Sequence, residues 1–232
     1  MQDIAVLFQI GPVGISSTVV LTWIIMLVLT LSSMMVTRRL GESRPGMAQV
    51  GLETVVSAIE ETISNVMAEK PGLLVPFVGT LWVFIVVSNL VGVLPGLHSP
   101  TGDLSLTAAL AVLVFFSVHW YGIRVDGLRR YLQHYLKPSP LLFPFHILSE
   151  FSRTLALAVR LFGNIASLEM AALLVLIVAG FLVPVPLLML HVVEALIQAY
   201  IFGMLALVYI AGGIQSLHTS RQKLQKKTEK TE

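Results

Sequence analysis

Residues 146–180 read "HILSEFSRTLALAVRLFGNIASLEMAALLVLIVAG", and this stretch decides the fold. As a helix it is about 50 Å long at 1.5 Å per residue, whereas the hydrocarbon core of a membrane is about 30 Å thick. An upright helix of this length would overshoot the membrane. We expect strong tilt, since no proline interrupts the segment, and the alternative is a break near Gly163 or, in the next segment, near Gly203.

The rest of the chain is also unusually apolar. Of its 232 residues, 56% are hydrophobic and only 12% are charged, against about 25% charged in a soluble domain. Charged residues are absent from 4–36, 71–102, 104–123, 170–193 and 195–220. Charge-free apolar runs of this length predict membrane-spanning helices, so we expect one all-α, polytopic membrane domain over residues 1–232.

The pattern places the elements of that domain. We expect spans at 16–36, 73–94 and 104–121, long tilted helices at 146–180 and 186–218, and a basic tail at 219–232. The segment 47–69 differs, because Leu52, Val55 and Ile59 fall at helical spacing while Glu53 and Glu60 take other positions. This segment is predicted to be an amphipathic helix lying on the membrane surface or against a partner.

The basic residues predict the orientation. With five hydrophobic segments, 13 of the 15 Lys and Arg residues fall on one side of the membrane. By the positive-inside rule that side is cytoplasmic, so the N-terminus is expected outside and the C-terminus inside the cell's inner (plasma) membrane. The start of the chain carries Asp3 but no Lys or Arg, which favours a retained first helix over a cleaved signal.

Several classes of function find no support in the sequence. No Cys is present, which excludes disulfides and Cys-ligated metals, and no Walker loop, HExxH motif or serine elbow occurs. We therefore expect no cofactor, no bound metal and no nucleotide or nucleic acid bound directly by this chain. A single Arg does not make a voltage sensor, which needs several at regular spacing.

Charges inside the apolar segments need an explanation. An arginine at the middle of a membrane, as Arg160 is expected to be, raises the free energy of membrane insertion by about 2.5–3.5 kcal/mol. On a helix, Arg153, Arg160, Asn164 and Ser167 share one stripe, whereas Glu169 lies about 180° away and about 13 Å along the axis. Arg160 and Glu169 therefore cannot form a local salt bridge. We expect Glu169 to face the last segment and a water path.

The last long segment carries its own polar stripe. His191, Glu194 and Gln198 fall at i, i+3 and i+7. Each could be an ion-access residue or a structural hydrogen-bond partner. Asp103 precedes the third span, where a loop, a helix N-terminus and an outer vestibule are all compatible with its position.

Three stretches resemble subunit a of the F-type ATP synthase. They are "LALAVRLFGNIASLE" at 155–169, "LHVVEALIQAYIFGMLALVYIAGG" at 190–213, and "SNLVGVLPG" with "SPTGDLSLTAALAV" between 88 and 112. The resemblance covers about residues 75–213. The pairing of "RLFGN" with "IQAYIF" is specific to this family.

The resemblance implies a non-catalytic, ion-translocating stator subunit of a rotary ATP synthase. In the family, the Arg of "RLFGN" faces a rotating c-subunit ring, two half-channels bring ions to and from the ring carboxylates, and the last two helices lie nearly horizontal. The implied partners are the c ring, the b-subunit stator stalk, other ATP synthase subunits and lipid. The implied site residues are Arg160, Glu169, His191, Glu194 and Gln198, with Asn164, Ser167, Asp103, His146 and Glu150 as secondary candidates.

The chain also departs from the family pattern. Ser167 and Leu168 precede the acid, where many members have a small residue and Gly, and Thr154 replaces a common Pro. His146 stands where many members carry an acid, and Glu150 follows one turn later. These changes indicate a divergent branch. The transported ion, H⁺ or Na⁺, stays open, as do a stand-alone ion-coupled secondary transporter using Glu169 and His191 and a non-transporting membrane scaffold.

Overall fold

The computed structural model describes residues 6–10, 13–38, 46–67, 71–94, 97–127, 143–179 and 184–228. Within these ranges the fold is helical, which confirms the expected all-α class. A short antiparallel hairpin precedes the helices, formed by β1 (Val6–Ile10) and β2 (Val13–Ser16). The sequence analysis did not predict this hairpin.

The described ranges contain five apolar helices. Four are long and apolar enough to span a membrane: α1 (Ser17–Thr37), α4 (Leu104–Asp126), α6 (Phe143–Ala179) and α7 (Pro184–Thr228). A shorter apolar helix, α3 (Val75–Val91), follows a 3₁₀ turn at Pro71–Leu73. The amphipathic segment forms α2 (Met47–Val66).

Helices α4 and α7 both end later in the sequence than expected. Helix α4 continues past residue 121 to Asp126, with Arg124 in its last turn, where a cation interacts favourably with the helix dipole. It stops at Gly127, whose positive φ of 81° suits glycine. Helix α7 likewise runs beyond the expected end at 218, to Thr228.

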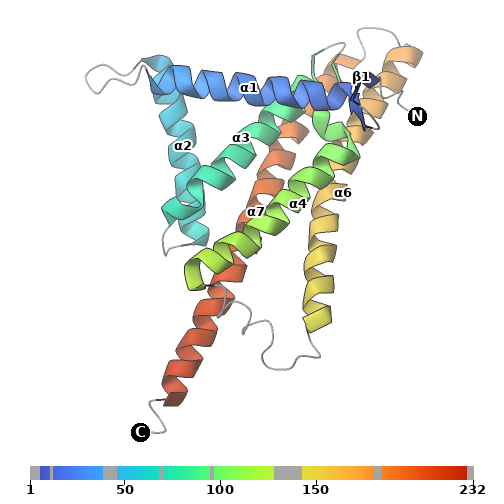
Figure 1. Ribbon diagram of the computed structural model, residues 1–232. Helices are drawn as coiled ribbons and strands as arrows, with labels where there is room; N and C mark the ends of the chain where they lie inside the picture. Colours follow the sequence, from blue (N-terminus) through green and yellow to red (C-terminus); the bar gives the residue numbers. More distant parts are fainter. Residues whose placement is uncertain are drawn as a thin grey trace.

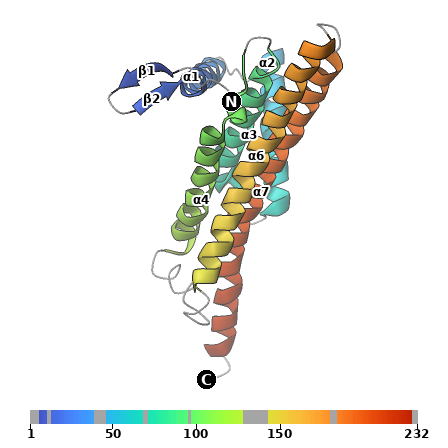
Figure 2. The ribbon, with the colours of Figure 1, turned by 90° about the vertical axis from the view of Figure 1, so that its right-hand side faces the viewer.

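The two last helices are long and uninterrupted. Helix α6 has 37 residues and α7 has 45, and neither breaks at Gly163 or Gly203. They lie side by side, and α1 runs crosswise to both (Figures 1 and 2). The 21 residues of α1 span about 31 Å, close to the hydrocarbon thickness. If α1 stands upright, α6 and α7 must be strongly tilted.

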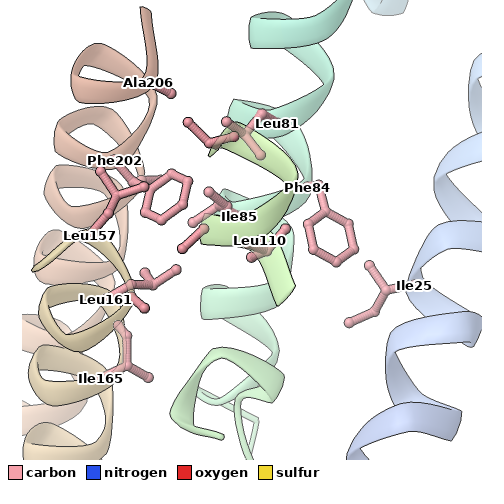
Figure 3. Packing of buried hydrophobic residues seen from close by; sticks show 14 residues of the cluster. Ile25, Leu81, Phe84, Ile85, Leu110, Leu157, Leu161, Ile165, Phe202 and Ala206 are labelled. Carbon is pink, nitrogen blue, oxygen red and sulfur yellow. The ribbon is translucent and has the colours of Figure 1, made fainter. Parts of the chain in front are cut away.

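Apolar side chains from four helices fill the centre of the bundle. Ile85 of α3, Leu110 of α4, Leu161 of α6 and Phe202 of α7 meet in one buried cluster (Figure 3). Ile25 attaches α1 to the edge of this cluster. A second cluster joins α2, α3, α4 and α7 through Ile63, Met67, Leu74, Val78, Trp82, Val118, Leu207, Ile210, Ala211 and Ile214. Apolar side chains of both α6 and α7 stay exposed outside these clusters, among them Val159 and Ile197.

Helices α3 and α7 approach closely at Gly203. The Trp82 indole N–H donates to the carbonyl of Tyr200 at 3.3 Å, and the two rings stack with centroids 6.0 Å apart. A Cβ placed on Gly203 would overlap the Trp82 indole. Gly203 is thus required by close packing rather than by backbone conformation.

We expect Gly203→Ala to destabilise the subunit by about 1–3 kcal/mol, because the added methyl group overpacks the Trp82 contact. The measurement is thermal unfolding of the purified subunit in detergent. Gly212→Ala is the matched control, since nothing lies within 4 Å of a Cβ there. Removing a helical glycine at that position should leave the stability unchanged or raise it by up to about 1 kcal/mol. Equal behaviour of the two variants would contradict this packing account.

An exposed arginine between two polar clusters

The stripe predicted on α6 lies on its exposed face. Arg153, Arg160, Asn164 and Ser167 are all exposed. Apolar neighbours on the same helix, such as Val159, are exposed as well. Within the described part of the chain, Arg160 makes no hydrogen bond or ion pair. A permanent positive charge therefore stands on an apolar, uncovered helix face.

Glu169 lies on the other side of α6, as the helical geometry predicted, and is only 7% exposed. The backbone N–H of Ser99 donates to its Oε1 at 2.6 Å, and Nδ1 of His98 lies 3.9 Å from its Oε2. These polar contacts come from the connection between α3 and α4. Glu169 thus contacts the α3–α4 connection, a neighbour that the sequence analysis did not predict.

The α3–α4 connection holds this position through its own hydrogen bonds. Its 3₁₀ turn, η2 (Pro100–Gly102), is buried. The Ser99 hydroxyl donates to the carbonyl of Ser88 at 2.9 Å and lies 2.6 Å from the Thr101 hydroxyl. Thr101 in turn donates to Oδ1 of Asn89, whose Nδ2 donates to the carbonyl of Ala195 at 3.1 Å. A continuous polar network thus links Glu169 on α6 to the backbone of α7.

The polar side chains of the α7 stripe contact two different helices, α3 and α6. His191 is 2% exposed and interacts with the backbone of Asn89 and with the half-buried Glu194. Gln198 is 1% exposed and accepts a hydrogen bond from Nδ2 of Asn164 at 2.7 Å. His191 therefore joins the Glu169 network, which we call the outer cluster: Ser88, Asn89, His98, Ser99, Thr101, Glu169 and His191.

A second group of polar side chains lies toward the start of α6. Nε2 of His119 is 3.8 Å from Oε2 of Glu150, and the Arg153 guanidinium lies 5.0 Å from the Tyr209 ring centroid. These contacts join α4, α6 and α7. A cavity of about 20 Å³ lies among Glu150, Arg153, Thr154 and Tyr209, large enough for one water molecule. We call His119, Glu150, Arg153, Thr154 and Tyr209 the inner cluster.

The remaining candidates are placed as follows. Asp103 caps α4, accepting from the backbone N–H and the hydroxyl of Ser105 at 2.9 and 2.8 Å, so the helix N-terminus interpretation holds. His146 lies in the first turns of α6, and its side chain is outside the described part of the chain. In the described ranges, no group of three or more His, Asp or Glu side chains is arranged to hold a metal ion.

Sequence reasoning missed His98 and Ser99 as members of these clusters. The signal for both was available in the short loop "GVLPGLHSPTGD", where a histidine sits between two apolar spans and glycines flank it. The glycines at 92 and 102 are the positions where the backbone approaches the Glu169 carboxyl group.

The Asn164–Gln198 pair makes a testable contribution to stability. Asn164→Leu leaves the buried Gln198 amide unsatisfied, which we expect to cost about 1–3 kcal/mol. The double variant Asn164→Leu/Gln198→Leu removes both polar partners and should recover much of that loss. Thermal unfolding of the purified subunit measures both, with Ser152→Ala, an exposed change on the same helix, as the control. A double variant less stable than the single one would contradict the pairing.

Comparison with known proteins identifies the family. The model of the ATP synthase A chain family matches residues 19–211. The chain is 58% identical to ATP synthase subunit a 2 of Pelobacter propionicus, over 98% of this chain and 100% of that protein. It is 62% identical to ATP synthase subunit a 1 of Hahella chejuensis (89% and 88% covered) and 57% identical to ATP synthase subunit a of Legionella pneumophila (90% and 91%). The chain therefore belongs to the ATP synthase A chain family, as a multi-pass membrane subunit of that complex.

Proposed function

We propose that this chain is the ion-translocating stator subunit of a rotary ATP synthase. It forms two half-channels that pass H⁺ or Na⁺ to and from the carboxylates of a rotating c ring, and Arg160 is the charge barrier between them. The observation that carries the proposal is the position of Arg160, exposed on an apolar face with no partner among the described residues.

A guanidinium in this position calls for a partner from another chain. Arg stays protonated at any relevant pH, so Arg160 cannot become neutral to reduce the cost of contact with lipid. A carboxylate on a neighbouring ring would supply the missing charge. Near the fixed guanidinium the charged form of that carboxylate is favoured, so an arriving neutral carboxyl group releases its ion there.

The two clusters suit entry and exit paths. Glu169 lies nine residues after Arg160, about 13 Å along α6, and Glu150 lies ten residues before it, about 15 Å in the other direction. Each carboxylate belongs to a different cluster, and Arg160 lies between them. A cation that moved directly from one cluster to the other would have to pass a permanent positive charge. The cation is instead carried from one cluster to the other by a carboxylate of the rotating ring. Each ion that crosses a potential of 100 mV supplies about 2.3 kcal/mol for rotation.

The rest of the assembly follows from this arrangement. The c ring would lie against the uncovered face of α6 and α7, while the b-subunit stalk and other subunits hold this chain static. ATP would form in a separate soluble sector, so this subunit is not itself catalytic. We place the N-terminus outside and the basic C-terminal tail in the cytoplasm, in the inner membrane. No observation favours the stand-alone transporter or the scaffold.

The direct test is ion-driven ATP synthesis by the assembled complex carrying Arg160→Ala. We expect coupled synthesis to be lost, while ATP hydrolysis by the detached soluble sector continues. Arg124→Ala is the matched control, because it removes an exposed arginine from the last turn of another helix, α4. Normal coupled synthesis with Arg160→Ala would refute the proposed role.

The inner cavity gives a second test. The larger side chain of Thr154→Leu fills a cavity that has room for one water molecule. We therefore expect ion-driven synthesis to fall severalfold. Thr154→Val keeps the shape and removes only the hydroxyl, so its activity should stay near that of the unchanged chain. If Thr154→Leu left synthesis unaffected, the inner cluster would not be an ion path.

A further inference from the structure

The carboxyl group of Glu169 is enclosed on most sides. A Cβ on Gly92 would lie 2.9 Å from Oε1, and one on Gly102 would lie 3.1 Å from Oε2. The N–H of Ser99 already occupies Oε1. Any larger residue at the two glycine positions would press on the carboxylate. Glu169 is therefore held in one position, with little of its surface open to water.

One exposed titratable group adjoins this enclosed carboxylate. His98 is 69% exposed, and its Nδ1 lies 3.9 Å from Oε2 of Glu169. That distance exceeds a hydrogen bond, which needs about 2.7–3.2 Å, but a small ring movement or one bridging water closes the gap. His98 precedes Ser99, whose hydrogen bonds to Ser88 and Glu169 fix the loop. The imidazole is thus kept beside the carboxylate, and most of its surface is exposed.

The surroundings favour a proton over a metal ion. Among the described residues, Glu169 of α6 is the one acid in ion-pair contact with His98. Asp103, which follows the 3₁₀ turn, accepts hydrogen bonds from Ser105 instead. The nearby oxygens of Ser99, Thr101 and Asn89 are hydrogen-bonded to one another. Among the hydroxyl groups of this cluster, only that of Ser88 is without a hydrogen bond, so a hard cation would find too few free oxygen ligands beside Glu169. Imidazole changes charge near neutral pH and is suited to carry protons.

We propose that His98 is the proton relay between the outer aqueous phase and Glu169, which makes H⁺ the ion taken up on this side. The proposal rests on the function proposed above. A hydronium ion protonates Nε2, the Nδ1–H bond then breaks, and that proton forms an O–H bond with Oε2. The products are neutral imidazole and the neutral Glu169 carboxyl group. Rotation of the exposed ring or exchange with water restores the starting tautomer.

The experiment uses the whole ATP synthase complex in liposomes, with synthesis driven by a K⁺ diffusion potential at low buffer concentration. His98→Ala should slow synthesis about tenfold, the lower range of what a positioned proton-transfer group contributes. Imidazole in the compartment facing the 97–103 loop should restore the rate to within about twofold of the unchanged complex, and ammonium at the same concentration should not. Leu97→Ala, the exposed neighbour, is the matched control and should behave normally.

Two results would overturn the relay. Synthesis by His98→Ala at the normal rate would show that Glu169 needs no imidazole. Slow synthesis that imidazole does not restore would show a structural role for His98. Arg160→Ala is measured in the same preparation to separate the two proposals. If Arg160→Ala is inactive and His98→Ala is normal, only the relay fails; if Arg160→Ala synthesises ATP, the stator role itself fails.

Discussion

One electrostatic constraint governs this structure: the Arg160 guanidinium stays charged on an apolar helix face. The cost of such a charge in a membrane is several kcal/mol and cannot be removed by deprotonation. Nothing in the described part of the chain neutralises Arg160. The packing of α3, α4 and α7 against the other side of α6 leaves this face open. The fold therefore leaves the charge exposed instead of satisfying it internally.

The buried side of α6 follows the opposite rule, because its polar groups are satisfied within the chain. Glu169 is bound by Ser99, and Gln198 accepts from Asn164. Buried polar groups without partners are costly, which explains why the α3–α4 connection folds onto the membrane domain instead of projecting from it. Among the described residues, two buried side-chain atoms remain without a hydrogen bond, the Ser88 hydroxyl oxygen and Nε2 of His191, and both belong to the outer cluster.

Helical periodicity predicted which way each α6 residue points but not what it meets. The separation of Arg160 from Glu169 follows from nine residues at 100° each, and the structure has one exposed and the other buried. The partner of Glu169 depends on how a loop about 70 residues earlier folds back, and no local pattern encodes that distance. The pairing of His119 with Glu150 was missed for the same reason. The extension of α7 to Thr228 was missed because charged residues at 221–227 suggested a tail, although Lys, Arg and Gln are good helix formers.

The proposed contact between a ring of carboxylate-bearing subunits and the exposed face of α6 can be measured by cysteine cross-linking, because the chain contains no Cys. A single cysteine at Val159 lies beside Arg160 on the exposed face, and one at Leu113 lies on an exposed part of α4. Each is combined with a cysteine next to the carboxylate of the c subunit, and disulfide cross-linking is measured in the assembled complex. If the ring lies against α6, Val159→Cys cross-links efficiently to the c subunit and Leu113→Cys does not. Cross-linking from Leu113→Cys alone would contradict this position of the ring.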